Sequence, residues 1–259
     1  MTKYHWEIVQ KLYTRLRATD DAHKQRDIFL GVMSRFGYSD MLFGVLPQQI
    51  SSNDLELISI HTYDEEFWAK YIENDWVKHD NTVDHCLEFN DPVLWSDLAK
   101  EYVHDRLVTP EQRQLIKDTA EYGYVVGVTI PLYSHQSPYR YGLSLCQRDR
   151  TEADFADHDH MFSENEELIV HLAFTFFGHV NFTNVVKNHY NLTDEELILA
   201  RCLTMSINQA EIADLIVKLT SRQTFDNARV SRLKRSIREK LGLKKDSEIA
   251  EKAYLFGAL

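Results

Sequence analysis

The aromatic residues and prolines of this 259-residue chain are concentrated toward its N-terminal side. Of the 30 Phe, Tyr and Trp residues, only Phe225, Tyr254 and Phe256 lie beyond Tyr190, and all five prolines lie at or before Pro138. Proline interrupts helices and central strands, whereas aromatic side chains favour strands. We therefore expect two domains, of which the first mixes helices with strands and the second is built of helices alone.

The net charge also differs between the two parts. The whole chain carries a net charge of −11, but residues 193–259 hold 12 basic and 10 acidic residues, against 17 basic and 30 acidic residues in 1–192. Within the second part, residues 218–245 contain 10 basic and two acidic residues, a net of +8. The acidic total discourages contact with nucleic acid, whereas the local basic stretch favours it.

Hydrophobic spacing predicts the order of the elements. In the first part we expect helices within 5–37 and over 64–78, 110–122 and 151–182, and strands over 39–47, 55–63, 127–134 and 141–148. This order indicates an α+β domain over residues 1–182, with helices flanking a mostly antiparallel sheet. The polar segment 183–191 is predicted to be a linker. In the domain 192–259 we expect helices over 193–205, 209–216, 226–241 and 246–256.

Several classes of protein are disfavoured by the residue pattern. The three cysteines are widely spaced without a CxxC pair, and the N-terminus has no apolar signal core, so we expect a reduced, cytoplasmic protein. Residues 168–186 lack charged side chains but include histidines and asparagines, which favours a buried or partner-packed helix over a membrane span. His158, Asp159 and His160 would face different ways on one helix, so we expect no metal site and no cofactor.

The predicted helix 226–241 separates its apolar and basic residues. At about 100° per residue, Val230, Leu233, Ile237 and Leu241 form one stripe, and Arg232 and Arg235 point away from it. Arginine can pair bidentately with guanine, while lysine and serine can hold phosphates. The candidate DNA-binding residues are therefore Arg229, Ser231, Arg232, Lys234, Arg235 and Arg238. The alternative is a solvated face, or a helix that binds an acidic partner protein.

Residues 192–259 resemble the DNA-binding domain of LuxR-type transcription regulators. The matching features are LTxxE at 192–196, AEIA at 210–213, Val230, KLGL at 240–243 and the ending AxxxGxL. The resemblance implies a helix-turn-helix that binds a palindromic operator as a homodimer. This chain departs from the family at Ser206, where a glycine is usual, at Glu195, where an arginine is usual, and at 217–226, which resembles an insertion.

The first part of the chain resembles the autoinducer-binding domain of the same family. Tyr63, Tyr71, Asp80 and Trp95 fall at the family's intervals, and Ser144 lies on the later strand that carries a pocket serine. The resemblance implies a quorum-sensing signal of the N-acyl homoserine lactone class as ligand. In such a site an aspartate accepts from the amide N–H, a tyrosine or serine donates to the amide carbonyl, and an indole N–H donates to the lactone carbonyl.

Two positions depart from the family pattern. Phe67 stands where the lactone-reading tryptophan is usual, with Trp68 one step later, and Asn81 replaces a proline. Either Trp68 takes over through a local shift of the helix, or the lactone carbonyl has no indole partner and the ligand is not a standard acyl homoserine lactone. Simpler roles also remain open, because Asp80 could cap a turn and the two tyrosines and Trp95 could be core residues.

The leading interpretation is a ligand-responsive transcription regulator of quorum sensing that acts as a homodimer. Its candidate dimer surface is formed by Leu168, Ile169, Leu172 and Phe176. A receptor for a non-lactone molecule and a protein-interaction module are the alternatives. An enzyme that uses Asp80 with a histidine is disfavoured because the chain has no GxSxG, HExxH or glycine-rich phosphate loop.

Overall fold

The computed structural model describes residues 2–47, 57–104, 108–133, 139–204, 209–220 and 227–255. The chain divides into two compact units, Met1–Val180 and Asn181–Leu259. The predicted linker, 183–191, is helical for most of its length, since α8 spans Phe182–His189 and belongs to the second unit. Asn181 caps this helix, and its side chain accepts from the backbone N–H of Asn184.

The first unit is organised around a five-stranded antiparallel sheet. The strands are β1 (Asp40–Pro47), β2 (Ile58–His61), β3 (Val93–Leu94), β4 (Val126–Tyr133) and β5 (Tyr139–Gln147). Their order across the sheet is β2-β1-β5-β4-β3. The strands predicted over 127–134 and 141–148 correspond to β4 and β5, which pair antiparallel with Thr129 opposite Ser144. Residues 134–138 between them lie outside the described ranges.

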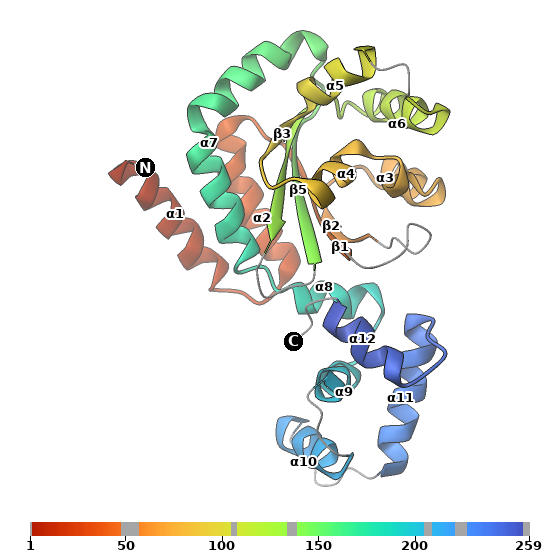
Figure 1. The fold of residues 1–259 in the computed structure, drawn as a ribbon. Coiled ribbons are helices and arrows are strands. Elements are labelled where there is room, and N and C mark those ends of the chain that lie inside the picture. The colour runs from red at the N-terminus through yellow and green to blue at the C-terminus, as the bar shows by residue number, and fades with distance from the viewer. Residues whose placement is uncertain are drawn as a thin grey trace. The chain divides into compact units, whose positions relative to one another are not determined.

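Helices cover both faces of this sheet (Figure 1). On one side lie α1 (Lys3–Leu16), α2 (Ala22–Met33) and α7 (Phe155–Phe177), and on the other α3 (Glu65–Glu73), α4 (Asn81–Glu88), α5 (Trp95–His104) and α6 (Pro110–Glu121). Short 3-10 helices lie at Ser34–Phe36, Trp76–Lys78 and Glu152–Asp154. The α+β prediction for this part of the chain is therefore confirmed.

The sequence pattern missed three elements between residues 79 and 109. These are α4, α5 and the strand β3, of which only the two-residue β3 is too short to show a hydrophobic period. The predicted helix 64–78 is also interrupted, because Asp75 adopts a left-handed backbone conformation with φ 54° between α3 and the following 3-10 helix. These corrections matter for function because α4 and α5 begin at Asp80 and Trp95.

Helix α7 packs into the interior of the first unit. Leu168, Ile169, Leu172 and Phe176 are at most 2% exposed. Phe176 stacks on Phe29 with ring centroids 4.6 Å apart and meets Phe43 edge-on at 5.5 Å. The prediction that these four residues form a dimer surface is therefore wrong, because the core of their own domain already covers them.

No described helix is by itself long and apolar enough to cross a membrane. Glu152–Phe177 and Phe182–His189 reach that length and composition only as a pair, and the pair is bent by 61°.

The second unit consists of helices. After α8 it contains α9 (Asp194–Thr204), α10 (Gln209–Thr220), α11 (Asn227–Leu241) and α12 (Ser247–Leu255). Its core joins Leu199, Ile212, Ile216, Val230, Ile237 and Ile249. Helix α10 continues past its predicted end at 216, so the start of the 217–226 segment is helical, whereas 221–226 and Ser206 lie outside the described residues.

Candidate functional site

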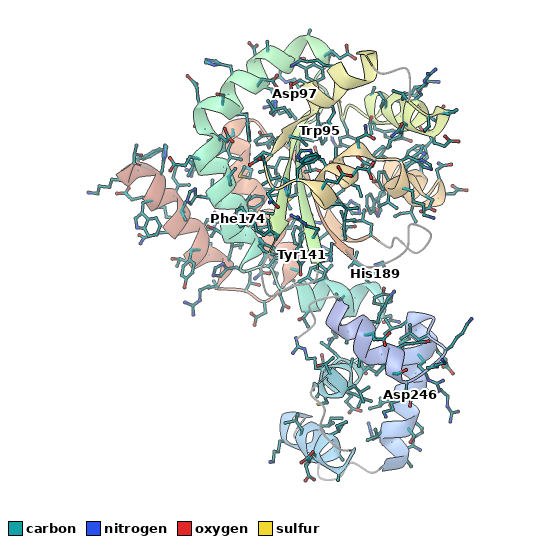
Figure 2. The ribbon with its side chains drawn as sticks, viewed as in Figure 1. Trp95, Asp97, Tyr141, Phe174, His189 and Asp246 are labelled. Carbon is teal, nitrogen blue, oxygen red and sulfur yellow. The ribbon has the colours of Figure 1, made fainter. Side chains whose placement is uncertain are left out.

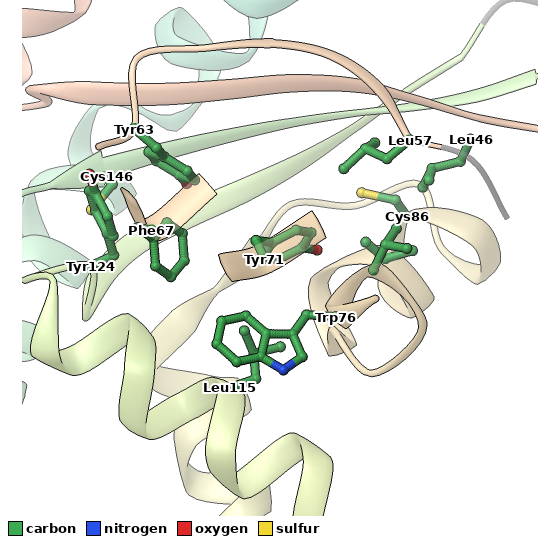
Figure 3. Packing of buried hydrophobic residues seen from close by; sticks show 12 residues of the cluster. Leu46, Leu57, Tyr63, Phe67, Tyr71, Trp76, Cys86, Leu115, Tyr124 and Cys146 are labelled. Atoms are coloured by element: carbon green, nitrogen blue, oxygen red, sulfur yellow. The ribbon is translucent and has the colours of Figure 1, made fainter. Parts of the chain in front are cut away.

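A cavity of about 400 Å³ lies between the sheet and helices α3, α5 and α6. Six of the seven predicted ligand-binding residues line it: Tyr63, Phe67, Tyr71, Asp80, Trp95 and Ser144. Figure 3 shows three of these aromatic side chains between the sheet and the helix that carries Leu115, and Figure 2 marks Trp95 at the start of α5. Residues from 63 to 144 are thus brought to one site.

The remaining predicted residue, Trp68, does not line the cavity. Its ring stacks on Tyr71 with centroids 5.2 Å apart and planes 8° from parallel, and its other neighbour is His61 at 4.2 Å. Phe67 is 1% exposed and occupies the cavity wall. The side chains of adjacent residues on a helix point about 100° apart, so α3 directs only one of Phe67 and Trp68 toward the cavity. Trp68 therefore does not take over the position of Phe67.

Asp80 caps a helix and also lines the cavity. As the N-cap of α4, its Oδ1 accepts from the backbone N–H of Thr82 at 2.9 Å and from the Thr82 hydroxyl at 2.6 Å. Its Oδ2 accepts from the Tyr71 hydroxyl at 2.9 Å and lies on the cavity. Burial raises the pKa of Tyr71 well above its ordinary value, so this hydroxyl stays protonated and donates.

A second hydrogen-bonded group crosses the sheet side of the cavity. The Trp95 indole Nε1 donates to the Thr129 hydroxyl at 2.9 Å, and the Thr129 and Ser144 hydroxyl oxygens are 2.9 Å apart. Thr129 is 1% exposed. The indole N–H is therefore already used within the protein, although Trp95 and Ser144 both line the cavity.

Sequence reasoning missed Thr129 and Tyr124. The signal for Thr129 is a threonine inside an otherwise apolar strand, directly opposite the predicted Ser144 in the ladder. Tyr124 lines the cavity, its hydroxyl accepts from the backbone N–H of Asp64 at 2.7 Å, and the Arg148 guanidinium lies 5.2 Å from its ring centroid. No local pattern indicates this arrangement, because its partners are far apart in sequence.

A smaller chamber of about 30 Å³ adjoins the same polar residues. It shares Leu42, Asp80, Thr82 and Ser144 with the large cavity, and Cys86 contributes to its wall. Gly142 leaves room for that side chain, since a Cβ there would lie 2.9 Å from the Cys86 Sγ. Burial raises the pKa of the Cys86 thiol to about 12, so the group is a neutral wall residue at neutral pH.

The rest of the large cavity is mainly apolar. Leu98, Leu115 and Phe155 contribute hydrophobic wall, and the polar residues Arg150 and Glu152 are also part of its lining. An apolar space with a few converging polar groups is the usual form of a small-molecule site. The Asp80 carboxylate can accept from an N–H or O–H of a ligand, and the Ser144 hydroxyl can donate to a carbonyl.

Within the described ranges, no group of three or more His, Cys, Asp or Glu side chains is placed to hold a metal ion. His158 is instead buried, with Nε2 3.2 Å from the Tyr38 hydroxyl and Nδ1 3.3 Å from the Asp159 carboxylate. Burial lowers the pKa of His158, although its contact with Asp159 opposes that effect.

The second candidate site is helix α11. Val230 and Ile237 are fully buried, and Leu233 and Leu241 pack against the same core, as the predicted apolar stripe requires. Arg232, Arg235 and Ser231 are exposed. The other three candidate residues make ion pairs within the unit: Arg229 with Glu195 at 2.8 Å, Lys234 with Asp246 at 3.8 Å and Arg238 with Asp246 at 3.0 Å.

Helix α9 holds α11 through a buried glutamate. The Thr193 backbone N–H donates to Glu196 at 2.6 Å and the Glu196 N–H donates to the Thr193 hydroxyl at 3.3 Å, so the LTxxE sequence at 192–196 forms a capping box. Glu196 also accepts from Ser236 at 2.6 Å and from Lys240 at 2.7 Å, both on α11. Burial alone would raise the pKa of Glu196, but these hydrogen bonds outweigh it and lower the pKa.

The fold and cavity of the first unit define a small-molecule-binding domain. Residues 21–176 match the model of the autoinducer binding domain, which spans more than half of the chain. The chain therefore belongs to the family of proteins with an autoinducer binding domain.

Individual relatives agree with this assignment. The transcriptional activator protein AnoR of Acinetobacter nosocomialis is 25% identical over 101 residues, which is 39% of this chain and 39% of AnoR. The N-acylhomoserine-lactone-dependent LuxR-family transcription factor CepR2 from Burkholderia cenocepacia has a similar structure, with TM-score 0.53 and 15% identity over 68% of this chain and 96% of that chain. These relatives are named as transcriptional regulators.

A longer structural match is found with SdiA in complex with octanoyl-rac-glycerol. The TM-score is 0.54 at 14% identity, and the match covers 99% of this chain and 96% of that chain. At this identity the likeness shows the fold alone. The autoinducer-binding part of the prediction is thus confirmed as a family and a fold, while the helix-turn-helix remains a prediction.

Proposed function

We propose that this protein is a ligand-responsive transcription regulator of the LuxR type that acts in the cytoplasm as a homodimer. The first unit binds an N-acyl homoserine lactone or a related acylated signal, and the second unit binds a palindromic operator through a helix-turn-helix. The observation that carries this proposal is the cavity that gathers six predicted residues around the Asp80 carboxylate. The AnoR and CepR2 relatives support the regulatory role.

The polar groups of the cavity suit the amide of an acylated signal. Asp80 keeps a carboxylate on the cavity and accepts from the ligand N–H. Ser144 donates to the amide carbonyl, with Thr129 behind it to fix its position. The aromatic residues around them exclude water, which strengthens each hydrogen bond.

A non-lactone acylated ligand is the second candidate, and the position of Phe67 favours it. Phe67 has no hydrogen-bond donor, Trp68 lies outside the cavity, and the Trp95 indole donates to Thr129. A lactone carbonyl would therefore find no indole N–H here, at a cost of about 1–3 kcal/mol for an unpaired polar group. The SdiA complex with octanoyl-rac-glycerol supports an acyl glycerol as the probe for this class.

The DNA-binding role is supported by the geometry of the second unit. Helix α10 precedes α11, which is anchored by Val230 and Ile237 and exposes Arg232 and Arg235. A helix that buries one apolar side and presents arginines on the other suits insertion into the major groove. Two copies in a homodimer would bind two half-sites and so multiply the affinity of one short helix.

The ligand proposal is tested by thermal unfolding of the full-length protein with octanoyl homoserine lactone and with octanoyl-rac-glycerol. We expect at least one of them to raise the Tm of the wild type and not of Asp80→Asn. Asparagine is as good an N-cap as aspartate, so this variant keeps α4 capped while removing the charge. Asp84→Asn, an exposed change on the same helix, is the control and should respond like the wild type. An equal response of Asp80→Asn and wild type would contradict the role of Asp80.

A further inference from the structure

Helix α11 carries two classes of basic residue. Arg232 and Arg235 are exposed, and neither forms an ion pair with another residue in the described part of the chain. The other four pair with acids of the same unit: Arg229 with Glu195, Lys234 and Arg238 with Asp246, and Lys240 with Glu196. Four of the six basic side chains on this helix are therefore paired with three carboxylates of the same unit.

The pair of Arg229 and Glu195 is the most closely fitted of those at the candidate DNA-binding residues. The Arg229 Nη2 contacts both carboxylate oxygens, at 2.8 and 3.2 Å, and its Nε lies 3.2 Å from Oε2. The Glu195 side chain is 13% exposed and that of Arg229 is 33% exposed. A multidentate guanidinium–carboxylate contact is strong and directional, so it holds Arg229 against α9.

Asp246 is shared by two further cations and holds them less firmly. It lies 3.0 Å from the Arg238 Nε and 3.8 Å from the Lys234 Nζ, and its side chain is 50% exposed. Figure 2 labels Asp246 in the second unit. Exposed ion pairs contribute little and are screened by salt, so a phosphate competes with Asp246 more easily than with Glu195.

We propose that Glu195 lowers the sequence-independent affinity for DNA by withholding Arg229 from the DNA phosphates. Non-specific DNA affinity comes almost entirely from phosphate contacts by basic residues, whereas base contacts carry the sequence information. By neutralising Arg229, Glu195 lowers affinity for all sequences while leaving Arg232 and Arg235 to read bases. This inference rests on the proposed DNA-binding function, and it assigns a role to a position where this chain departs from the LuxR pattern.

The proposal predicts a measurable change in salt dependence. Glu195→Gln removes the carboxylate that pairs with Arg229. One additional contact between Arg229 and a DNA phosphate should steepen the slope of log affinity against log salt concentration by about 0.9. A homodimer gains two such contacts, so the slope steepens by about 1.8 and the loss of affinity between 50 and 200 mM salt grows by a further factor of about 12. The gain in affinity should be the same on random duplexes as on the operator.

The experiment measures binding of the full-length protein to a labelled random-sequence duplex at several salt concentrations. Glu251→Gln is the matched control, because it removes one acid from the exposed surface of α12 without breaking a recorded ion pair between described residues. The double variant Glu195→Gln/Arg229→Gln should return to the wild-type slope. Thermal unfolding confirms that each variant is folded.

Arg229→Gln alone provides an independent measurement if Glu195→Gln does not fold. We expect its slope to equal that of the wild type, because Arg229 is already withheld; a slope shallower by about 1.8 would overturn the proposal. Equal slopes for Glu195→Gln and Glu251→Gln would also overturn it while leaving DNA binding intact. If the wild type binds no duplex even at 50 mM salt, the proposed DNA-binding function fails and this inference fails with it.

Discussion

The cavity and helix α11 fix their polar groups in opposite ways. In the cavity, the Asp80 carboxylate and Ser144 are held by neutral partners, Tyr71, Thr82 and Thr129. On α11, the basic side chains are either exposed or held by carboxylates. Neutral partners leave the charge of Asp80 available to a ligand, whereas acidic partners cancel the charge that a DNA-binding helix would use. Both regions therefore hold polar side chains in fixed positions, but the charge stays available to a ligand in the cavity and is partly cancelled on α11.

The largest expected effect comes from substituting the exposed arginines of α11, which differ from the paired ones in being available to DNA. Arg232→Ala and Arg235→Ala should each reduce operator affinity by about 1–3 kcal/mol per lost base contact, and two copies would contribute in the proposed homodimer. Neither should lower the Tm, because both side chains are exposed. Mobility-shift titration and thermal unfolding measure the two quantities. Operator affinity equal to that of the wild type in both variants would place the DNA-reading surface elsewhere.

Thr129→Val tests whether the cavity depends on its neutral hydrogen bonds. The substitution removes the acceptor of the Trp95 N–H, and an unpaired polar group in this environment costs about 1–3 kcal/mol of unfolding free energy. Ser144→Ala is the matched control, since it leaves the bond between Trp95 and Thr129 in place. We expect urea unfolding to show a smaller loss for Ser144→Ala, and equal losses would argue against this role of Thr129.

Gly142→Ala tests the packing of the small chamber. A Cβ would lie 2.9 Å from the Cys86 Sγ, which sits at the end of a short side chain that can rotate. We therefore expect a loss near the lower end of overpacking effects, about 1 kcal/mol, that Cys86→Ala relieves in the double variant. Additive losses in urea unfolding would show that the two residues do not compete for this space.

The smallest expected effect concerns pH in the second unit. Hydrogen bonds lower the pKa of Glu196 below the value of 4.5 expected for an unfolded chain. A lowered native pKa contributes stability above pH 4.5, and this stability is lost as the pH falls through the native pKa. Acid unfolding of Glu196→Gln, followed by circular dichroism, should therefore depend less on pH below 4.5 than that of the wild type. Identical pH profiles would exclude the contribution of Glu196.

Much of the fold could be predicted because its signals are local. The hairpin of β4 and β5, the capping box at Thr193 and the apolar stripe of α11 depend on residues close in sequence. The strand β3 was missed because it has only two residues, and the predicted dimer surface on α7 was wrong because an apolar helix looks the same whether it faces its own core or a partner.

The sequence by itself determined which residues could form the cavity and the basic helix. The intervals between Tyr63, Tyr71, Asp80 and Trp95 marked them as one set of residues. The helical period put Arg232 opposite the apolar stripe, which follows from the geometry of a single element. Only the tertiary structure decided that Phe67 and not Trp68 faces the cavity. It also decided that the Thr129 hydroxyl accepts the hydrogen bond of the Trp95 indole N–H, and that the Glu195 carboxylate pairs with Arg229. The last two contacts each join residues 34 positions apart, and no local periodicity specifies partners at such a separation.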